Sequence, residues 1–144
     1  MALNPDRIGH RYPSYRYEVC REKIREYAEA TGVTDPVYAD DTADIVAPPT
    51  FAACFTVIRG GVDLFDDPEL GAHRSLVHGS QEYECHRPLR PGDVLVCTPW
   101  ITDLVNRGRN DFLTLQVDCV DADRGEPAVT SRGTFIFFPD AEES

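Results

Sequence analysis

The sequence predicts an α+β fold in which an antiparallel sheet wraps around one buried helix. The segment from Phe51 to Ile58 is apolar apart from Thr56, and a helix that is apolar on nearly every side has to be surrounded by protein. From Ser75 onward, apolar and polar residues alternate with a period of two and short turns separate the runs, which indicates antiparallel strands. The length of 144 residues suits one domain, and we expect a single domain over residues 1–144.

The N-terminal part is expected to form a short strand and an amphipathic helix. Residues 15–19 open as a strand, and residues 18–31 carry a helical pattern whose apolar stripe consists of Cys20, Ile24, Tyr27 and Ala28. Gly32 suits the position after the last helical turn. Residues 34–44 are acidic and irregular, and Pro36 argues against a regular helix there.

The apolar helix is expected to begin near Thr50, after Ala47-Pro48-Pro49, and to stop at Gly60-Gly61. A layered domain usually gives each helix one wet face, so a single apolar helix beside a bent sheet indicates that the sheet wraps the helix. This is the hot-dog arrangement. It leaves one sheet edge over, and pairing that edge across a two-fold axis makes a double hot-dog, so we expect a dimer.

The second half of the chain is expected to form an antiparallel meander, because short turns join successive strands. Turn signals occur at Pro91-Gly92-Asp93 and at residues 106–110 and 121–126. The predicted strands cover residues 75–86, 94–101, 112–120 and 127–138. We expect the tail, residues 140–144, to be frayed and disordered.

Charge and hydropathy exclude several classes of protein. Twenty-five Asp and Glu against fourteen Lys and Arg give a net charge of −11, whereas a nucleic-acid binder usually has a basic balance or a basic stripe. No run of about 18 apolar residues is present, so we expect no membrane span. The first residues lack the apolar core of a secretory signal, and we therefore expect a cytoplasmic protein.

The five cysteines are odd in number and widely spaced. The sequence has no Cys-x-x-Cys pair and no histidine at zinc-ligand spacing from a cysteine, so neither a metal site nor a cofactor is expected. We interpret the cysteines as reduced thiols of a cytoplasmic protein, and we expect most of them to be buried.

Four short segments between residues 21 and 93 follow the pattern of one known family. From Arg21 onward the chain resembles the MaoC-like hydratases, specifically the N-terminal dehydratase subfamily found in two-subunit (3R)-hydroxyacyl-thioester dehydratases. The later strand pattern extends the similarity over nearly the whole chain. The matching segments are Arg21 to Tyr27, Asp35 to Asp40, Ala47 to Phe51, and Val77 to Tyr83 continuing into His86 to Asp93.

The active segment of that family is altered in this chain. Active members have an aspartate, then Asn-Pro, then a histidine five residues after the aspartate, because dehydration needs a carboxylate-held histidine that exchanges protons near neutral pH. A glycine N–H at the helix start polarises the thioester oxygen. Here Val33 stands in place of the aspartate, Tyr38 in place of the histidine and Pro49, which has no N–H, in place of the glycine. We therefore expect that this chain has no catalytic residue and does not perform the elimination itself.

Six residues are candidates for binding substrate. A core tyrosine and a rigid helix start would equally account for Tyr38 and for the prolines. His78 lies in a matched segment and suits either the acyl pocket or a surface turn. His86 and Arg87 suit either an anionic group, such as a phosphate of coenzyme A or a carrier protein, or an exposed strand end. The full set is Tyr38, Thr50, Phe51, His78, His86 and Arg87.

The resemblance implies a non-catalytic subunit that holds the acyl chain of an acyl-CoA or acyl carrier protein thioester, in fatty-acid or related lipid metabolism. A second hot-dog chain would supply the aspartate and histidine. An alternative is a hot-dog thioesterase, which needs a carboxylate near the central helix; Asp63 is the nearest, more than three turns after the helix start. A homodimeric acyl-binding protein without catalysis is the third possibility.

Overall fold

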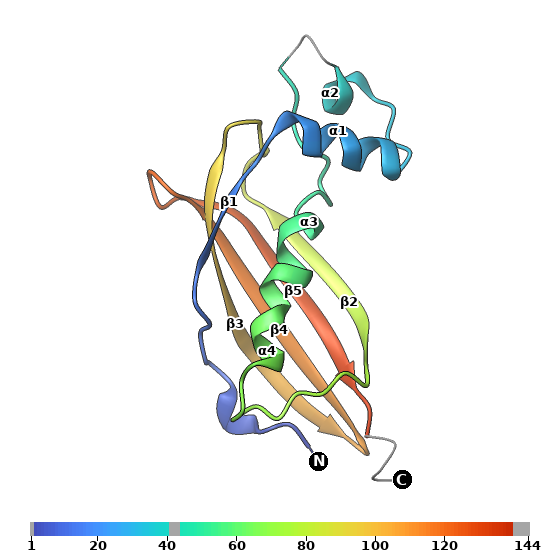
Figure 1. Cartoon of the computed structure of the whole chain (residues 1–144), viewed down its shortest axis with the longest axis vertical. Helices are drawn as coiled ribbons and strands as arrows, with labels where there is room; N and C mark the ends of the chain where they lie inside the picture. Colours follow the sequence, from blue (N-terminus) through green and yellow to red (C-terminus); the bar gives the residue numbers. More distant parts are fainter. Residues whose placement is uncertain (1, 41–43, 140–144) are drawn as a thin grey trace.

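The computed structural model describes residues 2–40 and 44–139, and it has the predicted hot-dog arrangement of a helix against an antiparallel sheet (Figure 1). Five strands form the sheet in the order β1-β3-β4-β5-β2. The elements in chain order are η1 (Pro5–Arg7), β1 (Tyr15–Glu18), α1 (Arg21–Ala30), α2 (Pro36–Ala39), α3 (Ala53–Thr56), α4 (Ile58–Phe65), β2 (Leu76–Cys85), β3 (Val94–Arg107), β4 (Asn110–Asp121) and β5 (Pro127–Phe137).

The topology differs from a simple meander at one place. β3, β4 and β5 are consecutive neighbours as predicted, but β2 pairs with β5 and lies at the sheet edge. The chain between β2 and β3 therefore crosses the end of the sheet instead of making a hairpin. The place beside β3 is taken by β1, which continues into a hydrogen bond from Val19 N to Asp93 O (2.8 Å). A strand from the N-terminal part thus displaces the expected hairpin.

Helix α1 confirms part of the predicted stripe. Ile24 and Ala28 are buried and Tyr27 is half-buried, whereas Cys20 is exposed at the N-cap. The prediction against helix at Pro36 was wrong, because Pro36 is the first residue of α2. A proline is tolerated there, since the N–H it lacks would have no partner in the helix. Asp35 caps the turn by accepting a hydrogen bond from Val37 N (3.0 Å).

The central helix is longer than predicted. It starts at Ala53 as α3, turns at Val57 and continues as α4 to Phe65, so Gly60-Gly61 does not stop it. Gly60 has a packing reason to lack a side chain: a Cβ atom there would lie 2.8 Å from Val117 Cγ2 on the sheet. The glycine permits close helix–sheet contact, which outweighs its low helix propensity.

The described part of this chain does not surround the central helix on its outer face, so the expectation that the helix is covered on every side depends on the expected dimer. Ile58 is 83% exposed and Val62 is 46% exposed, while Cys54 is also exposed. These three residues are four apart and form one stripe, which we call the outer stripe. The sheet of this chain covers only the opposite side, where Phe55 and Leu64 are buried.

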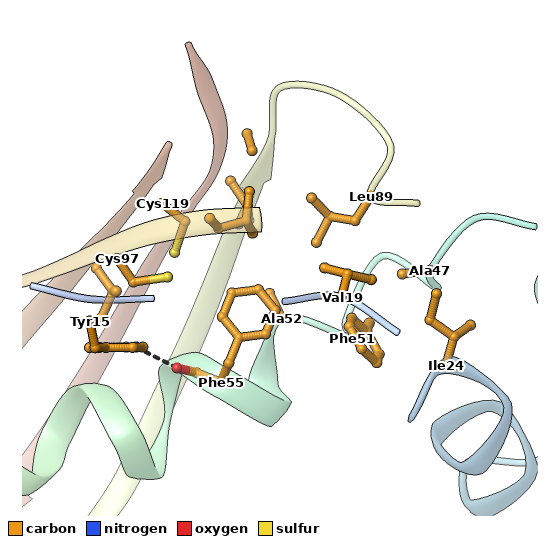
Figure 2. Close-up of a cluster of buried hydrophobic side chains, with 14 of the residues drawn as sticks. Tyr15, Val19, Ile24, Ala47, Phe51, Ala52, Phe55, Leu89, Cys97 and Cys119 are labelled. Atoms are coloured by element: carbon orange, nitrogen blue, oxygen red, sulfur yellow. Dashed lines mark hydrogen bonds between the residues drawn. The ribbon is translucent and has the colours of Figure 1, made fainter. Parts of the chain in front are cut away.

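Two buried clusters fill the space between helix and sheet. One lies under α3 and includes Phe51, Phe55, Cys97 and Cys119 (Figure 2), and the other lies under α4. The expectation that most cysteines are buried was wrong, because only these two are. The exposed ones lie at a helix cap, on the outer stripe and near the end of the edge strand, namely Cys20, Cys54 and Cys85.

An N-terminal clamp, formed by Arg7, Tyr12 and Asp67, holds the segment after α4. Tyr12 Oη donates to Asp67 Oδ2 (2.7 Å), and Arg7 Nη2 lies 3.0 Å from the same oxygen. Burial alone would raise the pKa of Asp67, but the hydrogen bonds from Tyr12 and Arg7 hold it below its usual range. The predicted tail, residues 140–144, lies outside the described residues.

Candidate functional site

A pocket of about 390 Å³ opens at the end of the sheet where α2, the segment before α3 and the end of β2 meet. Four of the residues singled out from the sequence line it: Tyr38, Pro49, His86 and Arg87. We call it the N-terminal pocket, because it lies at the N-terminal end of the central helix. The fold thus gathers residues that lie up to about fifty positions apart in the chain.

Backbone hydrogen bonds hold the wall of the N-terminal pocket. Val46 N donates to Val37 O (3.0 Å), and Ala47 N donates to Leu89 O (2.8 Å). The first bond fixes the segment before α3 to the α2 turn, and the second fixes it to the chain after β2. Tyr38 is held in position on α2, which Asp35 caps.

The start of the helix offers few free donors for an oxyanion. Pro48 and Pro49 have no N–H, and the amides of Phe51, Ala53 and Cys54 already donate to carbonyl oxygens of the same chain. An oxyanion hole needs N–H groups aimed at the place where the charge develops. At Pro49 itself the backbone has no donor for an oxyanion.

His86 lines the pocket without a carboxylate partner among the described residues. Its Nε2 lies 3.0 Å from Thr130 Oγ1, and its backbone N donates to Ala128 O (2.9 Å). A histidine with a hydroxyl neighbour lacks the acid that orients the base and stabilises its charged form. Val33, the position aligned with the family's aspartate, does not line this pocket.

Arg87 is largely committed to intrachain ion pairs. Its Nη1 lies 2.8 Å from Asp93 Oδ2 and its Nη2 lies 3.1 Å from Asp121 Oδ2. The hydrogen bond to Asp93 raises the pKa of Arg87 further, and the charge is matched by two carboxylates. Arg87 therefore holds the chain between β2 and β3 against the end of β4, and its capacity to bind an additional anion is reduced.

Three other candidates lie outside the N-terminal pocket. Thr50 Oγ1 and Tyr27 Oη are 2.6 Å apart at the protein surface, and Phe51 is fully buried. His78 is exposed near the other end of β2, where its ring stacks on Phe135 at 4.7 Å. His78 lies seven positions before the pocket residue Cys85 on β2, a separation of about 23 Å.

The sequence interpretation missed a second, apolar groove beside α4. It has a volume of about 240 Å³ and lies between the helix and the strands β2 and β5; Val57, Gly61, Phe65 and Phe135 are among its lining residues. A Cβ atom at Gly61 would meet nothing within 4 Å. A glycine pair inside an apolar helix was the available signal, but it resembles a stop signal when only the sequence is considered.

No helix of the described residues is both long and apolar enough to cross a membrane. Within residues 2–40 and 44–139, no cluster of three or more His, Cys, Asp or Glu side chains could hold a metal ion.

Solved structures of dehydratases have the same fold. A MaoC-like dehydratase superposes with a TM-score of 0.82 at 27% identity over 94% of this chain, which spans only 43% of that longer protein. The HadBC (3R)-hydroxyacyl-ACP dehydratase complex of Mycobacterium tuberculosis superposes with a TM-score of 0.71 at 26% identity, covering 88% of this chain and 92% of the matched one. The chain is thus similar to hot-dog proteins of the dehydratase class.

The family is established by the sequence profile of the FAS1-like dehydratase domain region, which matches residues 6–131, so the chain belongs to this family. Relatives of similar length are UPF0336 proteins: one of Saccharopolyspora erythraea is 38% identical over 99% of this chain and 96% of its own length. One of Streptomyces coelicolor is 40% identical over 91% of this chain and 92% of its own length. The resemblance inferred from the short segments is confirmed.

Proposed function

We propose that this chain is the non-catalytic, acyl-chain-holding subunit of a (3R)-hydroxyacyl-thioester dehydratase in fatty-acid or related lipid metabolism. The observation that carries the proposal is the N-terminal pocket. Its histidine, His86, has a hydroxyl and no acid beside it among residues 2–40 and 44–139, and the helix start has prolines where a donor is needed. Dehydration requires both an oriented base and a polarised carbonyl. The pocket is present, but the described residues that line it do not include the oriented acid–base pair that the reaction needs.

The groove beside α4 is the proposed place of the acyl chain. Its lining is almost entirely apolar, with Arg74 as the charged exception, and Gly61 leaves its floor open. Apolar surface takes up hydrocarbon because the chain leaves water. The thioester itself, of coenzyme A or of an acyl carrier protein, would then lie toward the N-terminal pocket, and no cofactor is required. We propose a cytoplasmic location.

A second hot-dog chain is the proposed source of the missing aspartate and histidine. The outer stripe of the helix is apolar and exposed. Strand β2 lies at an edge of the sheet, where Val77 is 47% exposed. Pairing that edge with a partner strand would remove the free N–H and C=O groups and cover the stripe in a double hot-dog. The HadBC and ChsH1-ChsH2 structures are themselves complexes of two different proteins by name.

The test is reconstitution with a hot-dog chain of the same organism that carries the intact Asp-x4-His segment. Hydration of a trans-2-enoyl thioester is measured for each chain alone and for the mixture. We expect turnover by the mixture at least tenfold above the sum of the two chains. Turnover by this chain alone at the rate of the mixture would overturn the proposal, and release of free acid and thiol would identify a thioesterase instead.

A matched pair of variants distinguishes binding of the acyl chain from supply of the catalytic base. Gly61→Leu fills the groove, and in the mixture we expect it to raise KM for a long-chain enoyl thioester while a short-chain one is little affected. His86→Gln removes the imidazole of this chain, and we expect kcat of the mixture to stay within about twofold. A hundredfold loss of kcat in His86→Gln would show that this chain supplies the base.

A further inference from the structure

Cys97 and Cys119 lie opposite each other on neighbouring strands and are both buried, with 0% and 1% of their surface exposed. They belong to the cluster under α3 that also contains Tyr15 and Phe55. Neither thiol lines the N-terminal pocket or the groove beside α4. The proposed function therefore gives the two thiols no role, and their chemistry is independent of it.

Cys97 and Cys119 form a non-hydrogen-bonded pair of the antiparallel sheet, in which the Cα atoms lie closer together than in a hydrogen-bonded pair. Ala122 N donates to Val94 O (2.9 Å), so Val94 and Ala122, which follow the same register, are a hydrogen-bonded pair. Pairs alternate along the ladder, and three steps further the pair Cys97–Cys119 is a non-hydrogen-bonded one. Cα atoms in such pairs lie about 4.5 Å apart, within the range of roughly 4.4–6.8 Å that a disulfide spans.

The side chains of Cys97 and Cys119 point to the same side of the sheet. Both sulfur atoms lie on the side of the sheet that faces α3 (Figure 2). The neighbouring Cys97 thiol and burial both raise the pKa of the Cys119 thiol. Cys97 lies on the strand next to the edge strand β1, whereas Cys119 lies one strand further in, so local opening of β1 reaches Cys97 first.

We propose that Cys97 and Cys119 form a disulfide modification site whose oxidant is a hydroperoxide. The sulfur of Cys97 attacks one peroxide oxygen; the S–O bond forms, the O–O bond breaks, and water leaves when the peroxide is hydrogen peroxide. The sulfur of Cys119 then attacks the resulting sulfenic acid; the S–S bond forms, the S–O bond breaks, and a second water carries away the thiol proton. Two thiols are oxidised and one peroxide is reduced.

Access to the site is expected through β1, the shortest strand of the sheet and one of its edges. Cys97 pairs with Tyr15 at the beginning of β1, an edge strand of only four residues. Short edge strands open locally at a lower free-energy cost than the whole domain. Oxidation of the pair is therefore expected to be slower than oxidation of the exposed cysteines, and the bond, once formed, joins β3 to β4 beneath Phe55.

The experiment uses a variant that keeps only the buried pair, Cys20→Ser/Cys54→Ser/Cys85→Ser. The folded protein is treated with hydrogen peroxide, its remaining thiols are blocked with N-ethylmaleimide in denaturant, and its intact mass and peptides are measured. We expect a product lighter by two hydrogens, with no blocked thiol and with Cys97 joined to Cys119. Dithiothreitol should restore both thiols. The same peptide map of the peroxide-treated wild-type chain covers the case in which the triple variant does not fold.

A matched control and a second readout decide the outcome. Adding Cys119→Ala to the same background should abolish the mass loss. The oxidised protein should melt roughly 10 °C higher than the reduced one, since the bond closes a loop of moderate length. Two thiols that remain open to blocking, separate oxidation to sulfinic acids, or an oxidised form that melts no higher than the reduced one would each overturn the proposal.

Discussion

On the inner face of the central helix, Phe55, Gly60 and Leu64 lie against the sheet, whereas on the outer face Ile58 and Val62 have little cover from the described residues. Both faces are apolar in sequence. The difference is that the inner face has its complement in the same chain, down to a glycine that admits Val117. An apolar helix face therefore indicates that a neighbour exists, but not which chain supplies it. Substitutions on the two faces test this contrast through the free energy of unfolding.

Phe55→Ala is expected to have the largest effect. Phe55 is 1% exposed and stacks on Tyr17 with ring centroids 4.3 Å apart. Truncating a buried phenylalanine leaves a cavity and costs about 3–5 kcal/mol. Ile58→Ala on the outer face is the matched control and should cost less than about 0.5 kcal/mol. Urea unfolding of both variants measures the difference, and equal losses would contradict the assignment of the faces.

The two adjacent glycines should respond in opposite directions to alanine. Gly60→Ala places a Cβ 2.8 Å from Val117 Cγ2, and overpacking of this kind costs about 1–3 kcal/mol. Gly61→Ala enters open space and should stabilise the helix by about 0.5–1 kcal/mol. In a Val117→Ala background, the loss of unfolding free energy caused by Gly60→Ala should be smaller. The gain caused by Gly61→Ala should be the same as in the wild-type background. Destabilisation by Gly61→Ala would show that the groove is closed in the folded chain.

The N-terminal clamp should make the free energy of unfolding decrease at acidic pH. The pKa of Asp67 is lowered in the folded chain, so its contribution is complete above its unfolded pKa of about 3.9 and is lost as pH falls through the lower folded value. Asp67→Asn should cost about 1–2 kcal/mol at pH 7, because the ion pair with Arg7 is lost. The free energy of unfolding of both proteins is measured between pH 7 and 2. The difference between the wild-type chain and Asp67→Asn should become smaller as the pH falls. A gap independent of pH would contradict a charged Asp67.

Ile58→Asp should have the smallest effect on the isolated chain and a large one on its complex. Ile58 is 83% exposed, so a carboxylate there stays hydrated and the free energy of unfolding should change by less than about 0.5 kcal/mol. In the mixture with the proposed partner chain, which is proposed to cover the outer stripe, a carboxylate at this position should weaken association at least tenfold because the partner would bury it. Sedimentation of the mixture measures this, and unchanged association would place the partner elsewhere.

Much of the fold was predictable because local patterns determine it. The strand alternation from Ser75 onward and the helical stripe with Ile24 and Ala28 were found in the structure. The place of β2 was not predictable. Both β1 and β2 could pair with the free side of β3, and in the structure β1 takes that side while β2 pairs with β5. A single sequence does not reveal which of the two strands pairs there. Helix α2 was missed because Pro36 was judged without its cap, Asp35.

The candidate site was predictable only where family segments marked it. Tyr38, Pro49, His86 and Arg87 come together in the N-terminal pocket, although they belong to separate segments. The commitment of Arg87 to two carboxylates needed the structure, since Asp121 lies 34 residues away. The groove at Gly61 was missed because an empty volume leaves no residue pattern.

The free edge of β2 has a consequence for how the chain is made in a cell. A ten-residue strand with an unpaired edge, beside a bare apolar stripe, is a template for self-association. If the second hot-dog chain is the natural cover, copies made in excess over it are left with that edge open. We therefore expect balanced synthesis of the two chains to raise the soluble yield, so that expression of this chain alone gives less soluble protein than co-expression.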